Sequence, residues 1–371
     1  MPVTSAITLP SHSPGATHTL LTHSFGSGEL PRSACIQAGT HADEHPGLLV
    51  IQHLMSELLQ LEAEGRIRGK IVVVPYANAI GLGQQIFGQM VGRYNLANGE
   101  NFNRNFADIT GRLDDALEKN DVAGFKALFA RALGETVPLE AVEANKYWLL
   151  KEALKHDVLL DLHCDTSSIL HIYANRSQQQ RAIELAAATG VKAVFVEEEA
   201  GGFPLDEAYA KAWNVIAKRG LVDTGHLGFS ATIELRGQAD VEDSIAAEDA
   251  QGILRYLHHE GLIDGGRERL RIPDDIVVYP LEGVAHLKSP ATGIVAWKKQ
   301  IGEAVTAGEV IAHIVPLDLS PGSPRHPVVS HVTGILVARH HIKLTRAGQK
   351  VGMLAGTTPL PERQTGKLMG L

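Results

Sequence analysis

Short apolar runs alternate with longer segments of helical periodicity along the first 265 residues. The apolar runs predict strands at about 33–38, 70–75, 157–163, 170–173, 192–197 and 229–235. Apolar positions at helical spacing predict helices at about 47–63, 112–134, 138–155, 178–189, 205–219 and 245–260. This alternation is typical of an α/β domain with a mostly parallel or mixed sheet. Residues 1–32 are expected to form a mostly extended lead-in, with an edge strand at about 17–24.

The pattern changes after the polar bridge at 264–269, where short strands and Gly turns replace the helices. We therefore expect a domain boundary near residue 270, which divides the chain into an α/β domain at 1–270 and a small β domain at 271–371. Two stretches of the second part, 286–314 and 328–354, share an order of strand, Gly turn and strand. This is a two-fold β repeat, most simply a small sandwich or barrel.

Composition and charge narrow the class of protein. The chain has 371 residues, more than the roughly 250–300 at which a single core stops growing, so two domains are expected. The formal net charge of -8, with no long basic run, argues against nucleic acid or an anionic membrane as partner. No apolar run reaches the roughly 18 residues of a membrane span. Cys35 and Cys164 are the only cysteines and give no disulfide framework, which fits a cytoplasmic location. A periplasmic protein without disulfides is the alternative.

His41 and Glu44 lie three residues apart on the turn between the strand at 33–38 and the helix at 47–63. Zinc binds imidazole nitrogen and carboxylate oxygen, so this spacing can supply two metal ligands from one turn. The alternative is a turn whose acidic residues cap the following helix.

His163 ends the apolar strand at 157–163, where a histidine is either a core imidazole bonded to a carbonyl or a third metal ligand. Asp161 and Asp165 flank it, and a metal-binding histidine normally donates its other N–H to such a group. Three protein ligands leave a fourth position open, which is the arrangement of a catalytic zinc. We therefore expect one zinc ion per chain.

Glu234 is the candidate general base, because apolar neighbours on the strand at 229–235 would raise the pKa of its carboxylate. The alternative is a surface glutamate paired with Arg236. Asn103 and Arg104 follow in a Gly- and Asn-rich loop at 76–106 and form a pair that suits a substrate carboxylate. Arg93 precedes them and could stabilise an oxyanion. The alternative for both arginines is a solvated surface.

Four motifs in this order, His41-x-x-Glu44, Asn103-Arg104, Asp161-Leu162-His163 and Ile233-Glu234-Leu235, resemble the succinylglutamate desuccinylase/aspartoacylase family, a branch of the zinc carboxypeptidase fold. The resemblance covers nearly the whole chain. It implies a three-layer α/β/α domain with a mixed sheet, followed by a small all-β domain.

The resemblance also implies a role for each matching residue. Zinc would be bound by His41, Glu44 and His163, and the water would be activated by Glu234. Asn103 and Arg104 would bind a substrate carboxylate, and Arg93 would polarise the amide carbonyl. No motif of this chain places the family's carboxylate-contacting tyrosine, and Tyr279 is named only as a guess.

The segment after Glu234 differs from that of some family members, and the second half of the chain resembles another kind of domain. Leu235-Arg236-Gly237-Gln238 differs from the Gly-Pro that follows the catalytic glutamate of aspartoacylases proper, which puts aspartate specificity in doubt. The second half resembles a biotinyl/lipoyl-like barrel sandwich through residues 289–295. The Met-Lys-Met acceptor hairpin is absent, so no attached biotin or lipoate is expected.

The predicted function is a zinc-dependent deacylase that hydrolyses the amide bond of a small N-acyl amino acid or related N-acyl amine. A zinc carboxypeptidase or a peptidoglycan-type amidase that acts on peptides is the alternative within the enzyme class. A metal-free binding or carrier protein is the alternative from another class. The acyl group and the amine are not indicated, and a homo-oligomer is left open.

Overall fold

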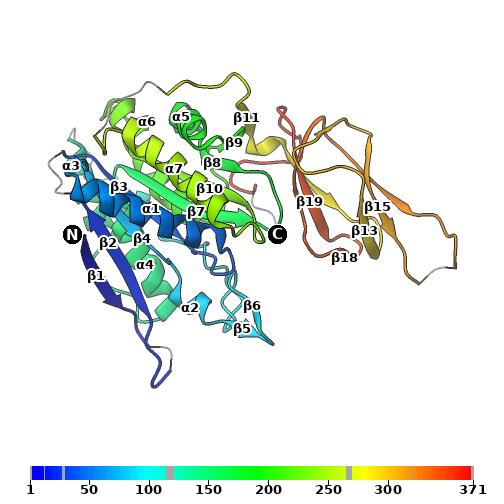
Figure 1. Ribbon diagram of the computed structural model, residues 1–371, viewed down its shortest axis with the longest axis horizontal. Helices are drawn as coiled ribbons and strands as arrows, with labels where there is room; N and C mark the ends of the chain where they lie inside the picture. The colour runs from blue at the N-terminus through cyan, green and yellow to red at the C-terminus, as the bar shows by residue number, and fades with distance from the viewer. Residues whose placement is uncertain are drawn as a thin grey trace.

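The computed structural model describes residues 2–11, 13–26, 30–113, 121–264, 270–318 and 320–368. A large α/β part is followed by an all-β part (Figure 1). The predicted α/β fold with a mixed sheet and a small β addition is confirmed. Within the described ranges, no helix combines the length and the apolar composition that crossing a membrane requires.

A nine-stranded sheet forms the centre of the α/β part, in the order β1-β2-β4-β3-β7-β10-β8-β9-β11. The strands are β1 (Val3–Thr8), β2 (Thr19–Phe25), β3 (Ser33–Ala38), β4 (Lys70–Val74), β7 (Val158–Asp165), β8 (His171–Asn175), β9 (Ala193–Glu197), β10 (Phe229–Gly237) and β11 (Val277–Pro280). β3, β4, β7 and β10 are parallel, and β8 is antiparallel to β10. The carboxyl ends of β3, β7 and β10 therefore meet at one edge of the sheet, where ligands gather in such folds.

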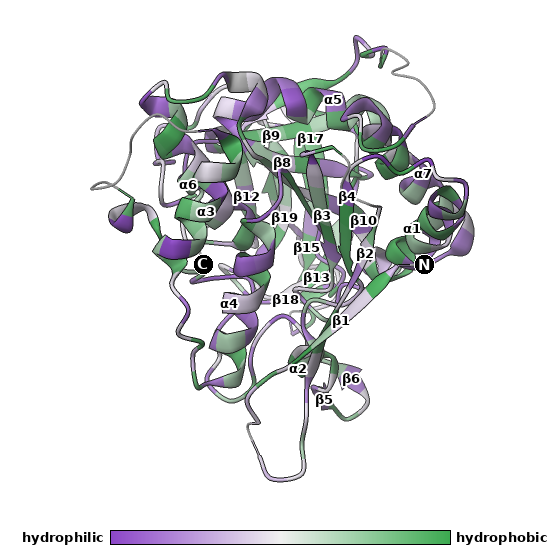
Figure 2. Ribbon diagram, turned by 90° about the vertical axis from the view of Figure 1, so that its left-hand side faces the viewer, coloured by the Kyte–Doolittle hydropathy of each residue, from purple (hydrophilic) through white to green (hydrophobic). Residues whose placement is uncertain are grey.

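Helices cover both faces of this sheet (Figure 1). One face packs against α1 (Pro46–Ala63), α5 (Gln179–Thr189) and α7 (Asp243–His259), and the other against α3 (Val122–Leu133), α4 (Ala141–Ala153) and α6 (Leu205–Lys218). In Figure 2, β3 and β4 are mostly hydrophobic, whereas the helices mix hydrophobic and hydrophilic residues. Strands buried on both faces explain the continuous apolar runs of the sequence.

The predicted helices and central strands are confirmed to within a few residues, with two differences. For the helix expected at 112–134, α3 covers Val122–Leu133, and residues 114–120 lie outside the described residues. The predicted edge strand is β2, but β1 pairs with its outer side and takes the edge position. β1 is exposed at nearly every position and carries no alternating pattern, so the sequence did not reveal it.

The second half forms two four-stranded antiparallel sheets, in the orders β12-β19-β17-β14 and β16-β15-β13-β18. The strands are β12 (Val284–Lys288), β13 (Gly293–Trp297), β14 (Ala304–Val305), β15 (Val310–Val315), β16 (His326–Val329), β17 (Gly334–Arg339), β18 (Leu344–Thr345) and β19 (Lys350–Ala355). Each sheet takes two strands from each repeat, so the two-fold β repeat is confirmed. β11 joins the large sheet, and the boundary at residue 270 stays a prediction.

Glu260 links α7 and α5 to the residue that precedes β3. It follows α7, and its carboxylate accepts hydrogen bonds from Arg32, Arg181 and the Tyr256 hydroxyl. Burial by itself would raise the pKa of Glu260, but the charges of Arg181 and Arg32 outweigh it and lower the pKa to about 2.

Glu260→Gln should therefore lower the free energy of unfolding by about 3 kcal/mol at pH 7. Because the folded-state pKa lies below the ordinary value, the contribution of Glu260 is complete above about pH 4.5 and is lost as the pH falls toward 2. Urea unfolding at pH 7 and pH 3 should give a difference between variant and wild type that shrinks to about half at pH 3. Glu248→Gln, an exposed change on α7, is the matched control. A difference independent of pH would contradict this account.

Candidate active site

The turn after β3 is held against β7 by close packing at Gly47. A Cβ added there would lie 3.0 Å from the Cβ atoms of both Ala38 and Leu162. The first turn of α1 can therefore rest directly on β3 and β7, which places Glu44 at the end of β7. At this position the Glu44 carboxylate is hydrogen-bonded to β7, since the backbone N–H of Cys164 donates to Glu44 Oε2 at 3.1 Å.

Glu44 lies between two imidazoles. Its Oε1 is 2.9 Å from His41 Nδ1, and its Oε2 is 2.7 Å from His163 Nδ1. All three residues are buried, and one ligand atom from each lies within 4.8 Å of the others. The structure thus brings together the three residues that the sequence suggested as metal ligands.

The far nitrogen of each imidazole faces an oxygen acceptor. His41 Nε2 is 2.8 Å from Asn101 Oδ1, and His163 Nε2 is 3.0 Å from Asp161 Oδ2. A proton on each Nε2 leaves the Nδ1 lone pairs directed at the cluster with Glu44. Metal-binding histidines are oriented in this way by carboxylate or carbonyl partners.

The electrostatics of the cluster favour a cation. Burial would lower the pKa of His163, but Asp161 and Glu44 outweigh it and raise that pKa well above its ordinary value. Burial would raise the pKa of Glu44, but His41 and His163 hold it well below its ordinary value. Two buried carboxylates therefore stabilise positive charge here, and two imidazoles with one carboxylate are a donor set that zinc accepts.

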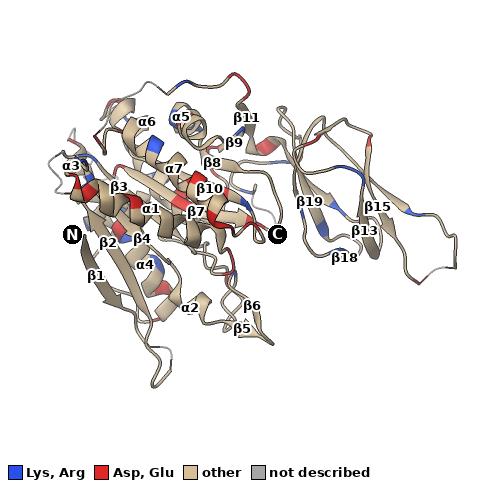
Figure 3. Cartoon of the chain, viewed as in Figure 1, with Lys and Arg blue, Asp and Glu red and all other residues tan. Residues whose placement is uncertain are grey.

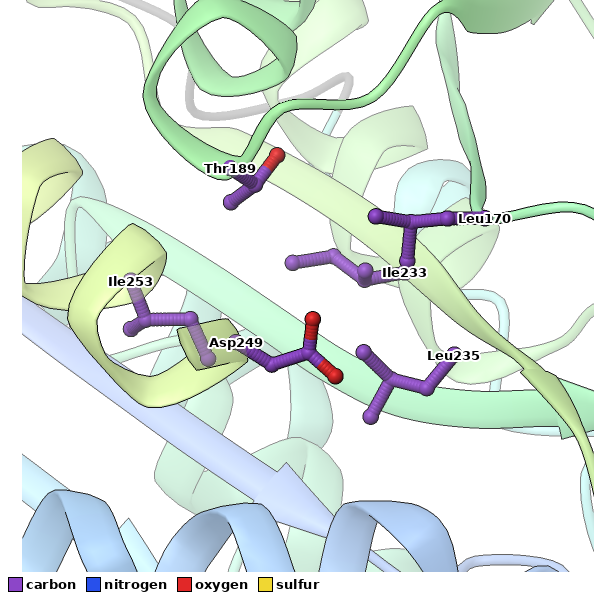
Figure 4. Close-up of a pocket in the computed structure, with 6 residues that line it drawn as sticks. All are labelled: Leu170, Thr189, Ile233, Leu235, Asp249 and Ile253. Atoms are coloured by element: carbon purple, nitrogen blue, oxygen red, sulfur yellow. The ribbon is translucent and has the colours of Figure 1, made fainter. Parts of the chain in front are cut away.

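Glu234 lies beside this cluster because of the strand register. In the parallel pair of β10 and β7, Glu234 is opposite His163 and Thr232 is opposite Asp161. Figure 4 draws Ile233 and Leu235 with Ile253 of α7, and strand alternation turns Glu234 to the other face. Glu234 Oε2 is buried and accepts no hydrogen bond from the described part of the chain. Burial and the charge of Glu44 raise the pKa of Glu234 to about 8.

The alternative pairing of Glu234 with Arg236 is wrong. β10 has a bulge between Glu234 and Gly237, and Arg236 adopts a positive φ of 62°. Its guanidinium instead binds both oxygens of Asp249 on α7, each at 2.8 Å. The bulge therefore separates Arg236 from the face that carries Glu234.

Arg93 reaches the same cluster from the loop at 76–106. Gly92 packs so closely on residues 42–43 that no Cβ could be added without displacing their backbone. Arg93 Nη1 donates to Glu44 Oε1 at 3.0 Å and lies 3.2 Å from His41 Nδ1. Its side chain is 42% exposed, so one guanidinium contacts both the cluster and the solvent side.

Asn103 and Arg104 lie next to the cluster. Asn103 Nδ2 is 3.3 Å from His163 Nε2, and its Oδ1 accepts a hydrogen bond from the backbone N–H of Leu205 at 3.1 Å. Arg104 is partly buried, and its Nη1 donates to the carbonyl of Asn103 at 2.6 Å. A Cβ added at Gly202 would lie 2.8 Å from Arg104 Cδ, so this glycine makes room for the arginine.

Two residues near the site were not singled out from the sequence. Asn101 is one of several asparagines in its loop, and nothing in the sequence distinguishes it as the partner of His41. Tyr173 on β8 is opposite Thr232 and so shares the face of Glu234. Tyr279 on β11 lies three strands from β10 and stacks on Phe195 at 5.5 Å between ring centroids. Tyr173, and not Tyr279, is the tyrosine on the strand beside Glu234.

Known proteins are similar to this chain in sequence and in fold. The chain is 27% identical over 340 residues to N-alpha-acetyl-L-2,4-diaminobutyric acid deacetylase of Halomonas elongata, covering 88% of this chain and 83% of that protein. A succinylglutamate desuccinylase/aspartoacylase family protein from Shewanella amazonensis has the same fold, with a TM-score of 0.81, 22% identity and coverage of 95% and 98% of the two chains. The product-bound ectoine utilization protein of Ruegeria pomeroyi superposes with a TM-score of 0.68 at 17% identity, covering 96% and 95%.

The family assignment rests on a separate comparison. The model of the succinylglutamate desuccinylase/aspartoacylase catalytic domain matches residues 31–260, which is more than half of the chain. That range includes the turn with His41, the loop with Arg93 and the strands with His163 and Glu234. The chain therefore belongs to the succinylglutamate desuccinylase/aspartoacylase family.

Proposed function

We propose that this protein is a zinc-dependent deacylase that hydrolyses the amide bond of a small N-acyl amino acid or related N-acyl amine. The observation that carries the proposal is the buried set of His41, Glu44 and His163 with Glu234 in register beside it. Family membership and the relative that deacetylates an N-acetylated diamino acid support the class of bond.

The metal would be held by the Nδ1 atoms of His41 and His163 and by the Glu44 carboxylate, with one ion per chain. When bound, zinc lowers the pKa of water and polarises a carbonyl oxygen. The protein orients the two imidazoles through Asn101 and Asp161, so the donors are preorganised before a metal enters.

Glu234 acts first as general base and then as general acid. Its carboxylate takes a proton from the water whose oxygen attacks the amide carbonyl carbon. It then delivers that proton to the amine nitrogen as the C–N bond breaks, which leaves a carboxylic acid and an amine. A raised pKa suits both the acceptance and the return of the proton.

The arginines and Asn103 orient the substrate in this proposal. Arg93 donates to the carbonyl oxygen as negative charge develops on it, a role supported by its position against Glu44 and its exposed side. Asn103 and Arg104 bind a substrate carboxylate from the adjoining loop. We also infer a cytoplasmic location, since Cys35 and Cys164 are both free and buried.

Replacing the base tests the mechanism. Glu234→Gln keeps the size of the side chain but cannot take a proton, so kcat should fall at least about 100-fold. Metal analysis should still find about one zinc per chain, because Glu234 is not a ligand in the proposal. Glu198→Gln, on an exposed loop, is the control and should stay active. Full activity of the Glu234 variant would end the proposed mechanism.

Removing a ligand tests the metal site. His163→Ala should lose nearly all bound zinc and activity, whereas His331→Ala, an exposed histidine of the β part, should keep both. A chelator should inactivate the wild type, and added zinc should restore activity. Wild-type protein that neither contains nor takes up zinc would instead support the metal-free binding protein.

A substrate panel separates the deacylase from the peptide-cleaving alternatives. We expect the wild type to hydrolyse members of a set of N-acetyl and N-succinyl amino acids, and not peptides of several residues. Released amine can be measured directly for every compound. Cleavage of peptides with no turnover of acyl amino acids would favour a carboxypeptidase or amidase.

A further inference from the structure

The β part is hydrogen-bonded to the segment that follows the strand with His163. The segment directly after β7 runs antiparallel to β17, with a bridge between Ser168 and Ala338. Ile169 N–H donates to the carbonyl of Val337 at 3.0 Å, and Arg339 N–H donates to the carbonyl of Ser167 at 2.9 Å. The position of this part relative to the site is therefore fixed by backbone hydrogen bonds.

β19 lies next to β17. It packs on one face of the large sheet, and Glu234 is on that same face. Met353 of β19 pairs with Ala338, and the Tyr173 hydroxyl lies 3.9 Å from Met353 Sδ. Lys350 begins the same strand, and its neighbour Val351 accepts a hydrogen bond from His340 N–H at 2.8 Å. Figure 3 shows Lys and Arg residues on the β part, including some near the labels β19 and β18. Lys350 is thus the first residue of the strand that packs on the face of Glu234 through Met353.

Lys350 is exposed, and its charge interacts with groups from both parts of the chain. These groups are the carboxylates of Asp165 and Glu234 and the guanidinium groups of Arg93 and Arg363. Its ammonium forms no ion pair or hydrogen bond with a residue in the described ranges. A lysine so placed can bind an incoming anion without first breaking an existing pair.

Two nitrogen atoms of residues that interact with Lys350 also lack hydrogen-bond partners in the described part of the chain. Arg363 Nε is buried and has no acceptor among the residues described, and His286 Nδ1 is likewise buried without a partner. Burial and the charges of Lys350 and Arg363 lower the pKa of His286 to about 3, so its ring is neutral at pH 7. Lys350 and Arg363 are therefore two cations on the same side of the site, where Lys350 interacts with Asp165 and Glu234, and Arg363 interacts with Glu282 and Glu362.

We propose that Lys350 determines specificity by binding a carboxylate of the substrate beside Glu234, with Arg363 adding to the positive potential. This inference rests on the proposed function and makes the β part a component of the substrate site. The carboxylate could belong to the amino acid or to the far end of a dicarboxylic acyl group. Both present the same anion to the same ammonium.

Equilibrium binding tests the proposal without turnover. Three probes are titrated by calorimetry into zinc-loaded Glu234→Gln protein with and without Lys350→Met. They are the best N-acetyl amino acid of the panel, its carboxamide, and the N-succinyl derivative of the corresponding decarboxylated amine. We expect Lys350→Met to raise Kd at least about 10-fold for one or both carboxylate probes, which identifies the source of the carboxylate. The Kd of a probe without the recognised carboxylate should stay within about two-fold.

Two controls keep the test decisive. Lys350→Arg should retain most of the affinity, and Lys298→Met, an exposed lysine of the β part, should leave all three Kd values unchanged. In the active background, Lys350→Met should raise KM by a similar factor with kcat within about three-fold. Thermal unfolding confirms that the variants fold.

The outcomes separate the two proposals. Equal changes for all three probes, or no change for any, overturn the role of Lys350 while hydrolysis by the wild type upholds the deacylase. Wild-type protein that neither hydrolyses nor binds any probe overturns the proposed function and this inference with it.

Discussion

The carboxylate of Glu44 is the group on which the site depends. It is buried, and each of its oxygens faces one imidazole, while the backbone N–H of Cys164 also donates to it. A buried charge is stable only when it is paired and hydrogen-bonded, so the positions of His41 and His163 are coupled to that of Glu44. Arg93 completes the set from a separate loop. The local charge balance therefore holds together three segments that are distant in sequence: the turn at 41–44, the loop with Arg93 and the end of β7.

The sheet makes this arrangement possible. Parallel β3, β7 and β10 bring three carboxyl ends to one edge, and their register sets His163 beside Glu234. On the opposite face the same strands present Ile36, Leu160 and Ile233 to a hydrophobic core. The other face also has a hydrophobic core, which includes Cys35 and Leu159, but near the carboxyl ends of these strands it carries polar groups that would be costly to bury without partners. Glu234 Oε2 is buried and has no hydrogen-bond partner among the described residues, so it is one group that bears this cost.

The β part shares a buried core with this sheet. It packs through Val337, Met353 and Ala355 on the face that also carries Phe195 and Tyr279. Backbone pairing with the segment after β7 fixes it close to His163. Side chains of the β part therefore lie close to the face of Glu234, and under the proposed function both parts of the chain would limit the size and charge of the substrate.

The sequence by itself determined most of the elements and predicted a chemistry for the site. Apolar runs and helical periodicity identified the core strands and helices because burial on defined faces dictates those patterns. The motifs with His41, Glu44, His163 and Glu234 pointed to zinc hydrolysis because few residue types bind that ion. The strand β1 was missed because an exposed edge strand carries no periodic signal.

Only the tertiary structure decided how these residues meet. The pairing of Arg236 with Asp249, the contact of Arg93 with Glu44, and the place of Tyr173 beside Glu234 follow from a bulge, a glycine contact and strand order. Lys350 is 116 residues from Glu234 along the chain. Such contacts arise from the packing of distant segments, and local sequence patterns encode the faces of elements but not which faces come together.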